Sequence, residues 1–512
     1  MSGDGLLPTG FCEQQRLRFI GISTPEERKK HGQFFTPLEV ARFMAGLASI
    51  KSKRLRLLDP GAGVGMLTCA VCERGAASKN LEEVHVDAYE NDARLVELLR
   101  ESLEFTNKWL ERSKIEFNYR IISEDFVLNN ARTLWNMPSS TYDLAISNPP
   151  YFKIGKNDPR AQVNLDMVYG QPNIYALFMG LAAELIREKG ALIFITPRSY
   201  TTGPYFKAFR KRFFKMMCPE RVHIFESRKD AFQADEVLQE NLILFARKRG
   251  LSGTMGISVS EGSGDLLRTK IYRVPISRAL HNVNKSDVIF RLPVNDEENG
   301  VLDTVDGWSG NLHKYGWEIS TGPVVPFRAR SLIPEERGDR EDAIPLLWMQ
   351  HVQPMEVKWP LYGNNDKEKQ QYIMDNPISR KRRLLVKNTN LVLLRRFSAK
   401  EEVRRLIAAP LLENQLPYRI IGIENHLNYI YRLQGKLTKE EAMGLASLLN
   451  SSLLDMYFRI SNGNTQVSAT ELRAMPLPPL KTLSELGSRV NERCKVPTLE
   501  EIDALVKEVL RI

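Results

Sequence analysis

The segment Asn148-Pro149-Pro150-Tyr151 follows directly on the apolar stretch 144–146. Two prolines fix the backbone and remove two N–H donors, so the carbonyl oxygen of Pro149 is available beside the side-chain amide of Asn148. Two acceptors at a strand end suit an amine with two N–H bonds, and Tyr151 offers a flat face to a planar amide or base. An amino group held in this way could attack a methyl group without a metal or a covalent intermediate.

A glycine-rich turn, DPGAGVG at residues 59–65, ends the first strand-like segment. Glycines at such a turn let the backbone approach a ligand closely and enter a helix sharply. The turn lacks the Gly-Lys-Ser/Thr of a P-loop and the GxGxxG of a dinucleotide site. The carboxylate of Asp59 would repel phosphate, but it can pair with an ammonium group.

Acidic and aromatic residues also end the next two strand-like segments. Glu90 follows the second, where a carboxylate can accept hydrogen bonds from two ribose hydroxyls. Asp125 and Phe126 end the third, where they offer an acceptor for an exocyclic amine and a ring for stacking on a base. Each residue alone is also typical of ordinary strand-end loops. Together, sites for an ammonium group, a ribose and an adenine indicate S-adenosylmethionine as the cofactor.

The elements that must position these residues alternate between strand-like and helix-like patterns. The strand-like segments are 55–59, 84–90, 119–126, 142–147, 191–197, 222–227 and 240–248. Helical periodicity is seen, among other places, at 174–190. The alternation predicts an α/β fold with a mostly parallel, seven-stranded sheet covered by helices on both faces.

The pattern changes near residue 250, where the Gly/Ser-rich stretch 251–265 indicates a boundary. We expect a catalytic domain at 1–265, an α+β domain at 266–480 and a helical segment at 481–512. Helical patterns in the second half are found at 400–412, at 439–460 and at the C-terminus.

Composition limits the class of protein. The 512 residues are 43% hydrophobic and 26% charged, which is typical of two or three globular domains. No apolar run approaches the roughly 20 residues needed to span a bilayer, and no signal peptide pattern is seen, so we expect a cytoplasmic protein. The five cysteines suit a reducing compartment, and Cys69 and Cys72 lack the further ligands of a zinc site. The net charge of +10 fits a nucleic-acid partner.

The motif NPPY downstream of DPGAGVG resembles the signature of amino-group DNA methyltransferases. The upstream segment HGQFFTP, residues 31–37, resembles the N-terminal cofactor motif of the same enzymes. This order is that of the γ class, similar to the Taq I-type and Pst I-type modification enzymes. The resemblance implies a Rossmann-like S-adenosylmethionine-dependent domain followed by a target-recognition domain, and weaker likeness continues through 424–430 and 463–479.

The resemblance also gives the residues expected roles. The residues expected to bind the cofactor are Thr36, Pro37, Asp59, Gly61, Gly63, Glu90, Asp125 and Phe126. Those expected to hold a flipped-out target base are Asn148, Pro149, Pro150, Tyr151 and, as a second aromatic, Phe232. The expected DNA contacts are Arg328, Arg330, Arg382, Arg383, Arg395, Arg396, Gln466 and Ser468. No metal is expected.

The implied reaction is site-specific methylation of adenine N6 in double-stranded DNA, by a monomer paired with a companion restriction endonuclease. Methylation of cytosine N4 remains an alternative, as does methylation of a protein glutamine or of ribosomal RNA at the same motif. An orphan methylase or an inactive scaffold would share many of these features. Cytosine C5 chemistry is excluded, since it needs a cysteine after a proline, and the sequence has only Cys218-Pro219 in the reverse order.

Overall fold

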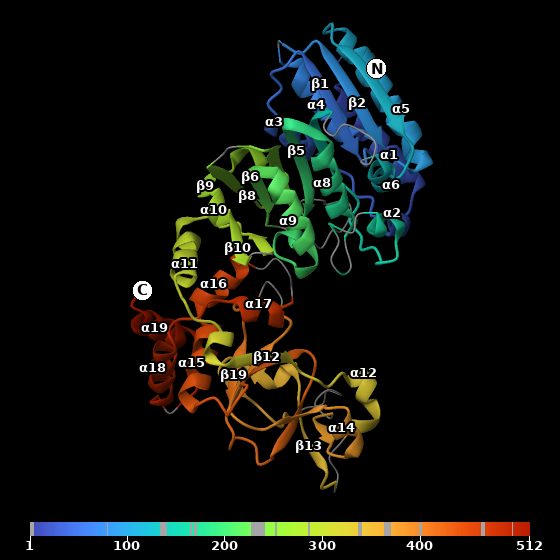
Figure 1. Ribbon diagram of the computed structural model, residues 1–512. Coiled ribbons are helices and arrows are strands. Elements are labelled where there is room, and N and C mark those ends of the chain that lie inside the picture. The colour runs from blue at the N-terminus through green and yellow to red at the C-terminus, as the bar shows by residue number, and fades with distance from the viewer. Residues whose placement is uncertain are drawn as a thin grey trace. The chain divides into compact units, whose positions relative to one another are not determined.

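The computed structural model describes residues 5–78, 80–133, 141–163, 166–167, 170, 173–226, 241–250, 253–284, 287–335, 340–362, 370–398, 402–461, 466–493 and 495–512. The chain divides into two compact units, unit 1 at Met1–Val294 and unit 2 at Asn295–Ile512. Figure 1 labels helices and strands of both units. No helix among the described residues is long and apolar enough to cross a membrane.

A large sheet forms the centre of unit 1. Its strands are β1 (Arg54–Pro60), β2 (Glu83–Tyr89), β3 (Glu116–Ile122), β4 (Tyr142–Ser147), β5 (Ile186–Pro197), β6 (Met217–Phe225), β7 (Asn241–Lys248), β8 (Thr254–Ser260) and β9 (Tyr272–Pro275). Within the described residues they lie in the order β3-β2-β1-β4-β5-β7-β6-β8-β9. The first five strands in this order are parallel to one another, and β7 is antiparallel to both its neighbours. The predicted α/β fold with a mostly parallel sheet is confirmed.

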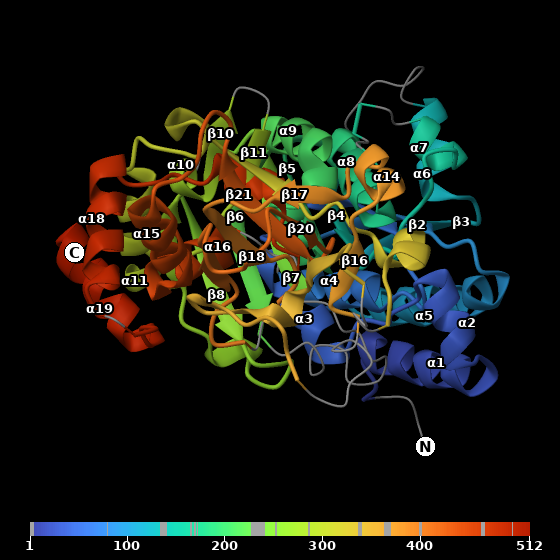
Figure 2. The ribbon, with the colours of Figure 1, turned by 90° about the horizontal axis from the view of Figure 1, so that it is seen from below.

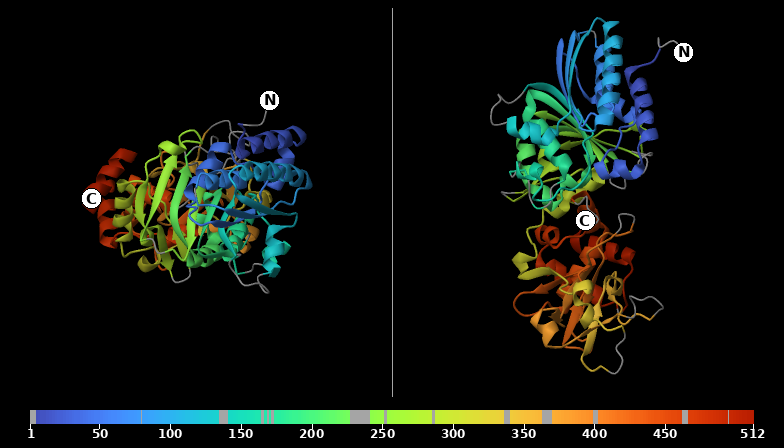
Figure 3. Two further views of the ribbon diagram at one scale, coloured as in Figure 1. Left: turned by 90° about the horizontal axis from the view of Figure 1, so that it is seen from above. Right: turned by 90° about the vertical axis from the view of Figure 1, so that its right-hand side faces the viewer.

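Helices cover both faces of this sheet (Figure 3). They are α1 (Pro8–Ile22), α2 (Pro25–His31), α3 (Leu38–Leu47), α4 (Met66–Ala76), α5 (Ala93–Glu111), α6 (Phe126–Thr133), α7 (Pro159–Gln162), α8 (Ile174–Leu185), α9 (Lys207–Met216) and α10 (Ile276–Ala279). Alternate strand residues enter different cores. Leu57 packs with buried residues of α1, α3, α4 and α5, while Leu58 packs with those of α8 and α9. Central strands such as β4 and β7 are therefore apolar on both faces, whereas β3 leaves Glu116, Asn118 and Arg120 exposed.

The sheet exceeds the predicted seven strands by two. The stretch 251–265, which we interpret as a boundary, contains β8, whose Met255 and Ile257 are fully buried and which pairs with β6 and β9. The hairpin of β10 (Leu280–Asn284) and β11 (Asp287–Phe290) also belongs to unit 1. The expected boundary after residue 265 consequently falls inside unit 1, because turn-forming Gly and Ser residues flank a strand that is itself apolar.

Unit 2 combines two four-stranded sheets, in the orders β12-β21-β18-β19 and β16-β13-β20-β17 of the described strands, with a two-stranded β14-β15 ribbon. Its strands are β12 (Trp317–Thr321), β13 (Ala343–Leu347), β14 (Val352–Gln353), β15 (Glu356–Val357), β16 (Tyr372–Met374), β17 (Leu385–Lys387), β18 (Leu391–Arg395), β19 (Ala408–Leu411), β20 (Ile420–Ile423) and β21 (Leu427–Arg432). Its helices are α11 (Asp296–Asp306), α12 (Pro326–Ala329), α14 (Pro377–Lys381), α15 (Lys439–Asn450), α16 (Ser452–Ser461), α17 (Ala469–Ala474), α18 (Leu480–Asn491) and α19 (Leu499–Leu510).

The C-terminal helices α18 and α19 share one hydrophobic core with α11, α15 and α16 and are thus part of unit 2 (Figure 2). The helix predicted at 400–412 is wrong. Residues 408–411 form strand β19, which pairs with β18 and buries every one of its residues. The apolar run there is short, and short apolar runs fit a buried strand as well as a helix.

Candidate functional site

A pocket of about 440 Å³ lies at the carboxyl ends of the parallel strands of unit 1. Its walls come from segments 31–35, 61–63, 89–95, 124–126 and 148–150, together with Phe178 of α8. These segments follow β1, β2, β3 and β4 or precede α3. Strand order reverses between β1 and β4, and ligands of open α/β sheets bind at this kind of reversal. The volume lies in the range of small-molecule and cofactor sites.

The glycine turn after β1 forms the floor of this pocket. Gly61 and Gly63 have φ values of 78° and 57°, a region that side chains with a Cβ avoid. The backbone N–H of Gly61 donates to the carbonyl of Tyr89 (2.9 Å), and that of Gly63 donates to Glu90 Oε2 (2.9 Å). The turn is therefore fastened to the end of β2.

The carboxylate of Glu90 lies in the pocket wall and is 8% exposed. Besides Gly63, the backbone N–H of Asp92 donates to it at 2.9 Å, on Oε1. Burial raises the pKa of Glu90, and these two backbone hydrogen bonds oppose the shift. Each carboxylate oxygen accepts only one of these bonds and can accept another from a ligand hydroxyl.

Asp59 does not line the pocket and is fully buried beneath the turn. Thr68 Oγ1 donates to its Oδ2 (2.6 Å), whereas Oδ1 has no hydrogen-bond partner in the described part of the chain. Burial raises the pKa of Asp59 to about 7, although the bonds from Thr68 lower it. A buried carboxyl oxygen without a partner, directly below a ligand-sized pocket, fits a cofactor that carries a cationic group.

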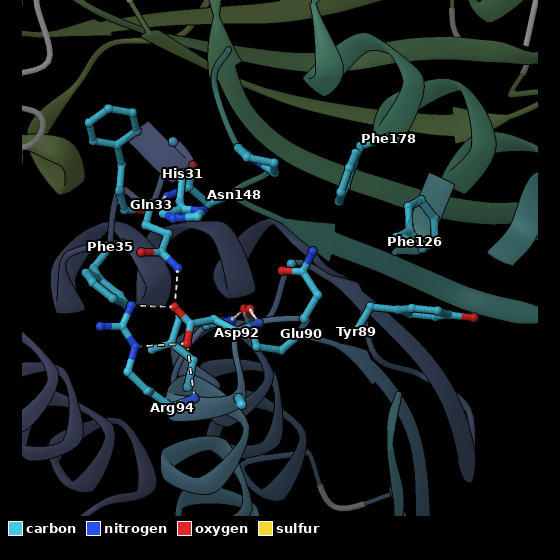
Figure 4. A pocket seen from close by; sticks show the side chains of 18 of the residues that line it. His31, Gln33, Phe35, Tyr89, Glu90, Asp92, Arg94, Phe126, Asn148 and Phe178 are labelled. Atoms are coloured by element: carbon cyan, nitrogen blue, oxygen red, sulfur yellow. Dashed lines mark hydrogen bonds and ion pairs between the residues drawn. The ribbon is translucent and has the colours of Figure 1, made fainter. Parts of the chain in front are cut away.

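An aromatic group lines one side of the pocket, opposite Gln33 and Arg94 (Figure 4). The ring of Phe126 lies 5.0 Å from that of Tyr89 and 5.0 Å from that of Phe178, measured between centroids. These rings suit a stacked base. Asp125 does not line the pocket, because its Oδ1 accepts from the N–H of Leu128 at the start of α6 (2.9 Å). Its neighbour Glu124 lines the pocket instead.

A polar network on the opposite side was not predicted. Asp92 Oδ2 accepts from Gln33 Nε2 (3.0 Å) and from Arg94 Nη2 (2.9 Å), as the dashed lines in Figure 4 show. Burial would raise the pKa of Asp92, but the bonds from Arg94 and Gln33 lower it to about 2. The guanidinium of Arg94 also lies over the ring of Phe19 (5.2 Å). The network ties the N-terminal segment to the start of α5.

The N-terminal motif reaches the pocket through residues 31–35, which precede the expected Thr36 and Pro37. Pro37 is the residue before α3. Thr36 is buried, and its Oγ1 accepts from Asn148 Nδ2 (3.1 Å). Gly32 has φ of 63°, and a Cβ there would lie 2.9 Å from the backbone nitrogen of Tyr151. The motif thus packs against the NPPY corner.

At that corner, Asn148 and Pro150 line the pocket, whereas Pro149 and Tyr151 do not. Asn148 Nδ2 donates to the carbonyl of Phe34 (2.6 Å) as well as to Thr36. Asn148 Oδ1 accepts from the Tyr151 hydroxyl (2.6 Å). The ring of Tyr151 is 9% exposed and stacks on that of Phe34, with centroids 5.6 Å apart. Phe232 lies outside the described residues.

The residues expected to contact DNA fall into two groups in unit 2. The guanidinium groups of Arg395 and Arg396 donate to backbone carbonyls, and the Gln466 amide oxygen accepts from Arg396 Nε (2.7 Å). Ser468 caps α17 by accepting from the N–H of Glu471 (3.2 Å). These side chains already make intramolecular contacts. The exposed group comprises Arg328, Arg330, Arg382 and Arg383.

In the part of the chain that the structure describes, no group of three or more His, Cys, Asp or Glu residues could hold a metal ion.

The family model of the Eco57I restriction-modification methylase matches residues 61–232 of this chain. The Type II methyltransferase M.BsuBI of Bacillus subtilis is 34% identical over 95% of this chain and 95% of its own length. The Type II methyltransferase M.PstI of Providencia stuartii is 32% identical over 93% and 92%. Among solved structures, the Type IIL restriction-modification enzyme MmeI in complex with DNA matches 98% of this chain and 74% of that chain, with a TM-score of 0.52 and 12% identity.

Proposed function

This chain belongs to the Eco57I-like restriction-modification methylases, with the Type II methyltransferases as relatives along nearly its whole length, and from this premise we propose its substrate. We propose that it methylates N6 of a flipped-out adenine at specific sites in double-stranded DNA. The observation that carries the proposal is the orientation of Asn148 in the pocket wall. Both hydrogens of its Nδ2 are engaged by Phe34 and Thr36, so Asn148 can offer a substrate only its oxygen.

The cofactor is S-adenosylmethionine, whose sulfonium supplies an electrophilic methyl group. The residues of the pocket fit it. We propose that Asp59 and the turn at Gly61 and Gly63 hold its amino-acid end, since the buried oxygen of Asp59 favours a nearby cation. Glu90 would accept from the ribose hydroxyls.

The adenine end of the cofactor would lie against the pocket's aromatic side. Tyr89, Phe126 and Phe178 present rings there, and the carboxylate of Glu124 lies in the same wall. We had expected Asp125 to accept from the exocyclic amine. Because Asp125 caps α6, we propose that Glu124 supplies this acceptor instead.

The target base would meet the NPPY corner. Asn148 Oδ1 and the carbonyl of Pro149 would accept from the two N–H bonds of its amino group, which leaves the nitrogen lone pair free for attack. Extruding a base from a duplex costs a few kcal/mol, and stacking in the pocket offsets part of this cost. We propose Tyr151 and Phe232 as the stacking pair. Phe34 now covers one face of Tyr151, so it must shift if the base stacks on that face.

The cellular setting is also a proposal. We propose a cytoplasmic monomer. We also propose that it protects host DNA from a companion restriction endonuclease, because the matching family model is that of restriction-modification methylases. Unit 2 would choose the DNA site, and unit 1 would carry out transfer.

The test is transfer of a labelled methyl group to duplex DNA, RNA and protein in parallel, followed by analysis of the labelled nucleosides. N6-methyladenine from duplex DNA is the expected product. N4-methylcytosine would show that the target base is cytosine and not adenine. Label found only in protein or RNA would contradict the proposal.

A further inference from the structure

Unit 2 carries a surface on which exposed arginines gather around an exposed aromatic ring. Phe327 and Arg328 lie in α12, and Arg330 begins the 3₁₀ turn Arg330–Leu332 that follows. Arg382 and Arg383 follow α14 directly. We call these five residues the arginine–phenylalanine surface. Figure 1 shows α12 and α14 as neighbours in unit 2.

The backbone beneath this surface is held in place. Arg382 Nη1 donates to the carbonyl of Arg328 (3.2 Å), which joins the two segments directly. Ala329 and Leu332 from one segment and Leu384 from the other are buried in one small hydrophobic core. That core also contains residues of β13 and β16. The positive charges are therefore brought together by packing, although they repel one another.

The charges of this surface have no ion-pair partner among the residues that the structure describes. Among the described residues, no carboxylate lies within 4 Å of Arg328, Arg330, Arg382 or Arg383, and all four are exposed. Arg380, in helix α14 just before Arg382, differs from them. Its Nε lies 2.6 Å from Asp375 Oδ1, so its charge is compensated. Four uncompensated guanidinium groups fixed on one surface favour a polyanionic partner.

Phe327 adds an apolar contact to this surface. Its side chain is 76% exposed, and the guanidinium of Arg328 lies 5.2 Å from its ring centroid. Aromatic rings beside arginines can stack on bases, with a cation–π contribution from the guanidinium, in nucleic-acid contacts. Guanidinium groups match phosphate and carboxylate oxygens alike in geometry, so it is the exposed ring beside them that favours nucleic acid over an acidic protein.

We propose that the arginine–phenylalanine surface is the DNA-contacting surface of unit 2. Its arginines contact phosphates of the duplex, and Phe327 packs against sugars or bases between those phosphates. The inference rests on the proposed function, because it takes duplex DNA as the partner. It separates these five residues from Arg395, Arg396, Gln466 and Ser468, whose contacts are internal.

The salt dependence of binding tests the arginines. Full-length wild type and the variant Arg328→Ala/Arg382→Ala are titrated with a short duplex of arbitrary sequence between about 50 and 200 mM salt. Loss of two phosphate contacts should reduce the slope of log K against log salt by about 1.8, since each contact contributes about 0.9.

Two control variants separate contact from net charge. Lys481→Ala/Lys507→Ala also removes two exposed charges from unit 2, from α18 and α19. Asp375→Ala/Arg380→Ala removes an ion pair with no net charge at α14, the helix that directly precedes Arg382. Both should keep the wild-type slope. A loss of slope in either that equals the loss in the arginine variant would overturn the proposal.

Phe327→Ala tests the aromatic contact. It should weaken duplex binding about tenfold and leave the salt slope unchanged, because no charge is lost. Tyr362→Ala is the matched control, since Tyr362 is 92% exposed in the same unit, and it should bind as wild type does. If the Phe327→Ala and Tyr362→Ala variants bind duplex DNA with equal affinity, Phe327 does not contact the DNA.

Methyl transfer by wild type, measured on the same preparations, distinguishes a wrong proposed function from a wrong assignment of the DNA-contacting surface. If wild type labels no DNA, the proposed function is wrong and the inference fails with it. If wild type labels DNA while the arginine variant keeps the wild-type salt slope, only the assignment of the surface is wrong.

Discussion

At the scale of single residues, Asn148 and Asp59 differ in their access to the pocket and in how fully their side chains are hydrogen-bonded. Asn148 reaches the pocket, and neighbouring groups fix the direction of its amide. Asp59 stays beneath the pocket with one oxygen unpaired, so its protonation can change when a cation binds nearby. The first residue is suited to hold a substrate amine, and the second to sense the charge of a cofactor.

Replacing Asn148 with alanine should separate binding from transfer. Asn148→Ala loses an acceptor for the substrate amine, and methyl transfer should fall at least about 100-fold because the amine is no longer positioned. Cofactor affinity, measured by calorimetry, should stay within about threefold of wild type because the other pocket walls remain. Unchanged turnover would reject the assigned role of Asn148.

The pKa of Asp59 predicts a pH-dependent stability. An aspartate in an unfolded chain has a pKa near 3.8, whereas burial raises that of Asp59 to about 7. The folded protein thus retains a proton that the unfolded chain loses, so its stability should fall as pH rises from about 4 to 7. The difference corresponds to roughly 4 kcal/mol.

Asp59→Asn should abolish this contribution. Unfolding midpoints of unit 1 without cofactor, measured at pH 5 and pH 8, should differ less in the variant than in wild type. If the midpoints at pH 5 and pH 8 differ equally in both proteins, ionisation of Asp59 does not reduce the stability of the folded protein.

At the scale of elements, the pocket depends on how segment 31–35 meets the end of β4. Gly32 allows this approach, since its φ of 63° and the 2.9 Å from its Cβ position to Tyr151 N leave no room for a side chain. The Gln33–Asp92–Arg94 network then fixes the same segment to α5. Two independent contacts therefore set the width of the pocket.

Gly32→Ala should widen or distort this junction. We expect a loss of about 1–3 kcal/mol of stability from the left-handed conformation, together with weaker cofactor binding. Gly46→Ala is the control, because Gly46 lies in α3 with nothing within 4 Å of its Cβ position. It should be neutral or stabilising by up to about 1 kcal/mol. Equal melting temperatures for the two variants would contradict the packing described for Gly32.

Sequence patterns predicted the strand-end residues of the pocket better than its other walls. Gly61, Glu90, Phe126 and Asn148 each follow an apolar strand, and such strands bring their ends to one edge of the sheet. Phe178 could not be singled out, because α8 is apolar on every side and its ring is one of many. Gln33 and Arg94 donate to the same carboxylate, that of Asp92, only in the folded chain, because 61 positions of sequence separate them.

Unit 2 was predicted less well for a related reason. Its strands are short, and local patterns such as 400–412 fit either a helix or a buried strand. The exposed Arg328 in α12 and Arg382 after α14 are far apart in sequence. A hydrogen bond from Arg382 to the carbonyl of Arg328 joins them, and no periodicity in the sequence predicts this contact.

At the scale of the whole molecule, each unit has its own hydrophobic cores, with the division at 294/295. The pocket draws all its lining residues from unit 1. If unit 2 chooses the DNA site, as proposed, we expect that catalysis and this choice can be lost separately.

Ending the chain after Val294 should leave a protein that binds S-adenosylmethionine as wild type does. Its affinity for duplex DNA should fall, and its preference for one sequence should disappear, because unit 2 is absent. Equilibrium binding and sequencing of methylated sites would measure both effects. If the truncated chain still methylates a single motif, unit 2 does not choose the DNA site.

The most direct test of the central claim is long-read sequencing of DNA from a host that lacks its own methylases and expresses this chain. We expect N6-methyladenine at nearly every copy of one short motif, and none when Asn148→Ala is expressed instead. Methylation of cytosine in place of adenine, or the same adenine methylation from the variant, would contradict it.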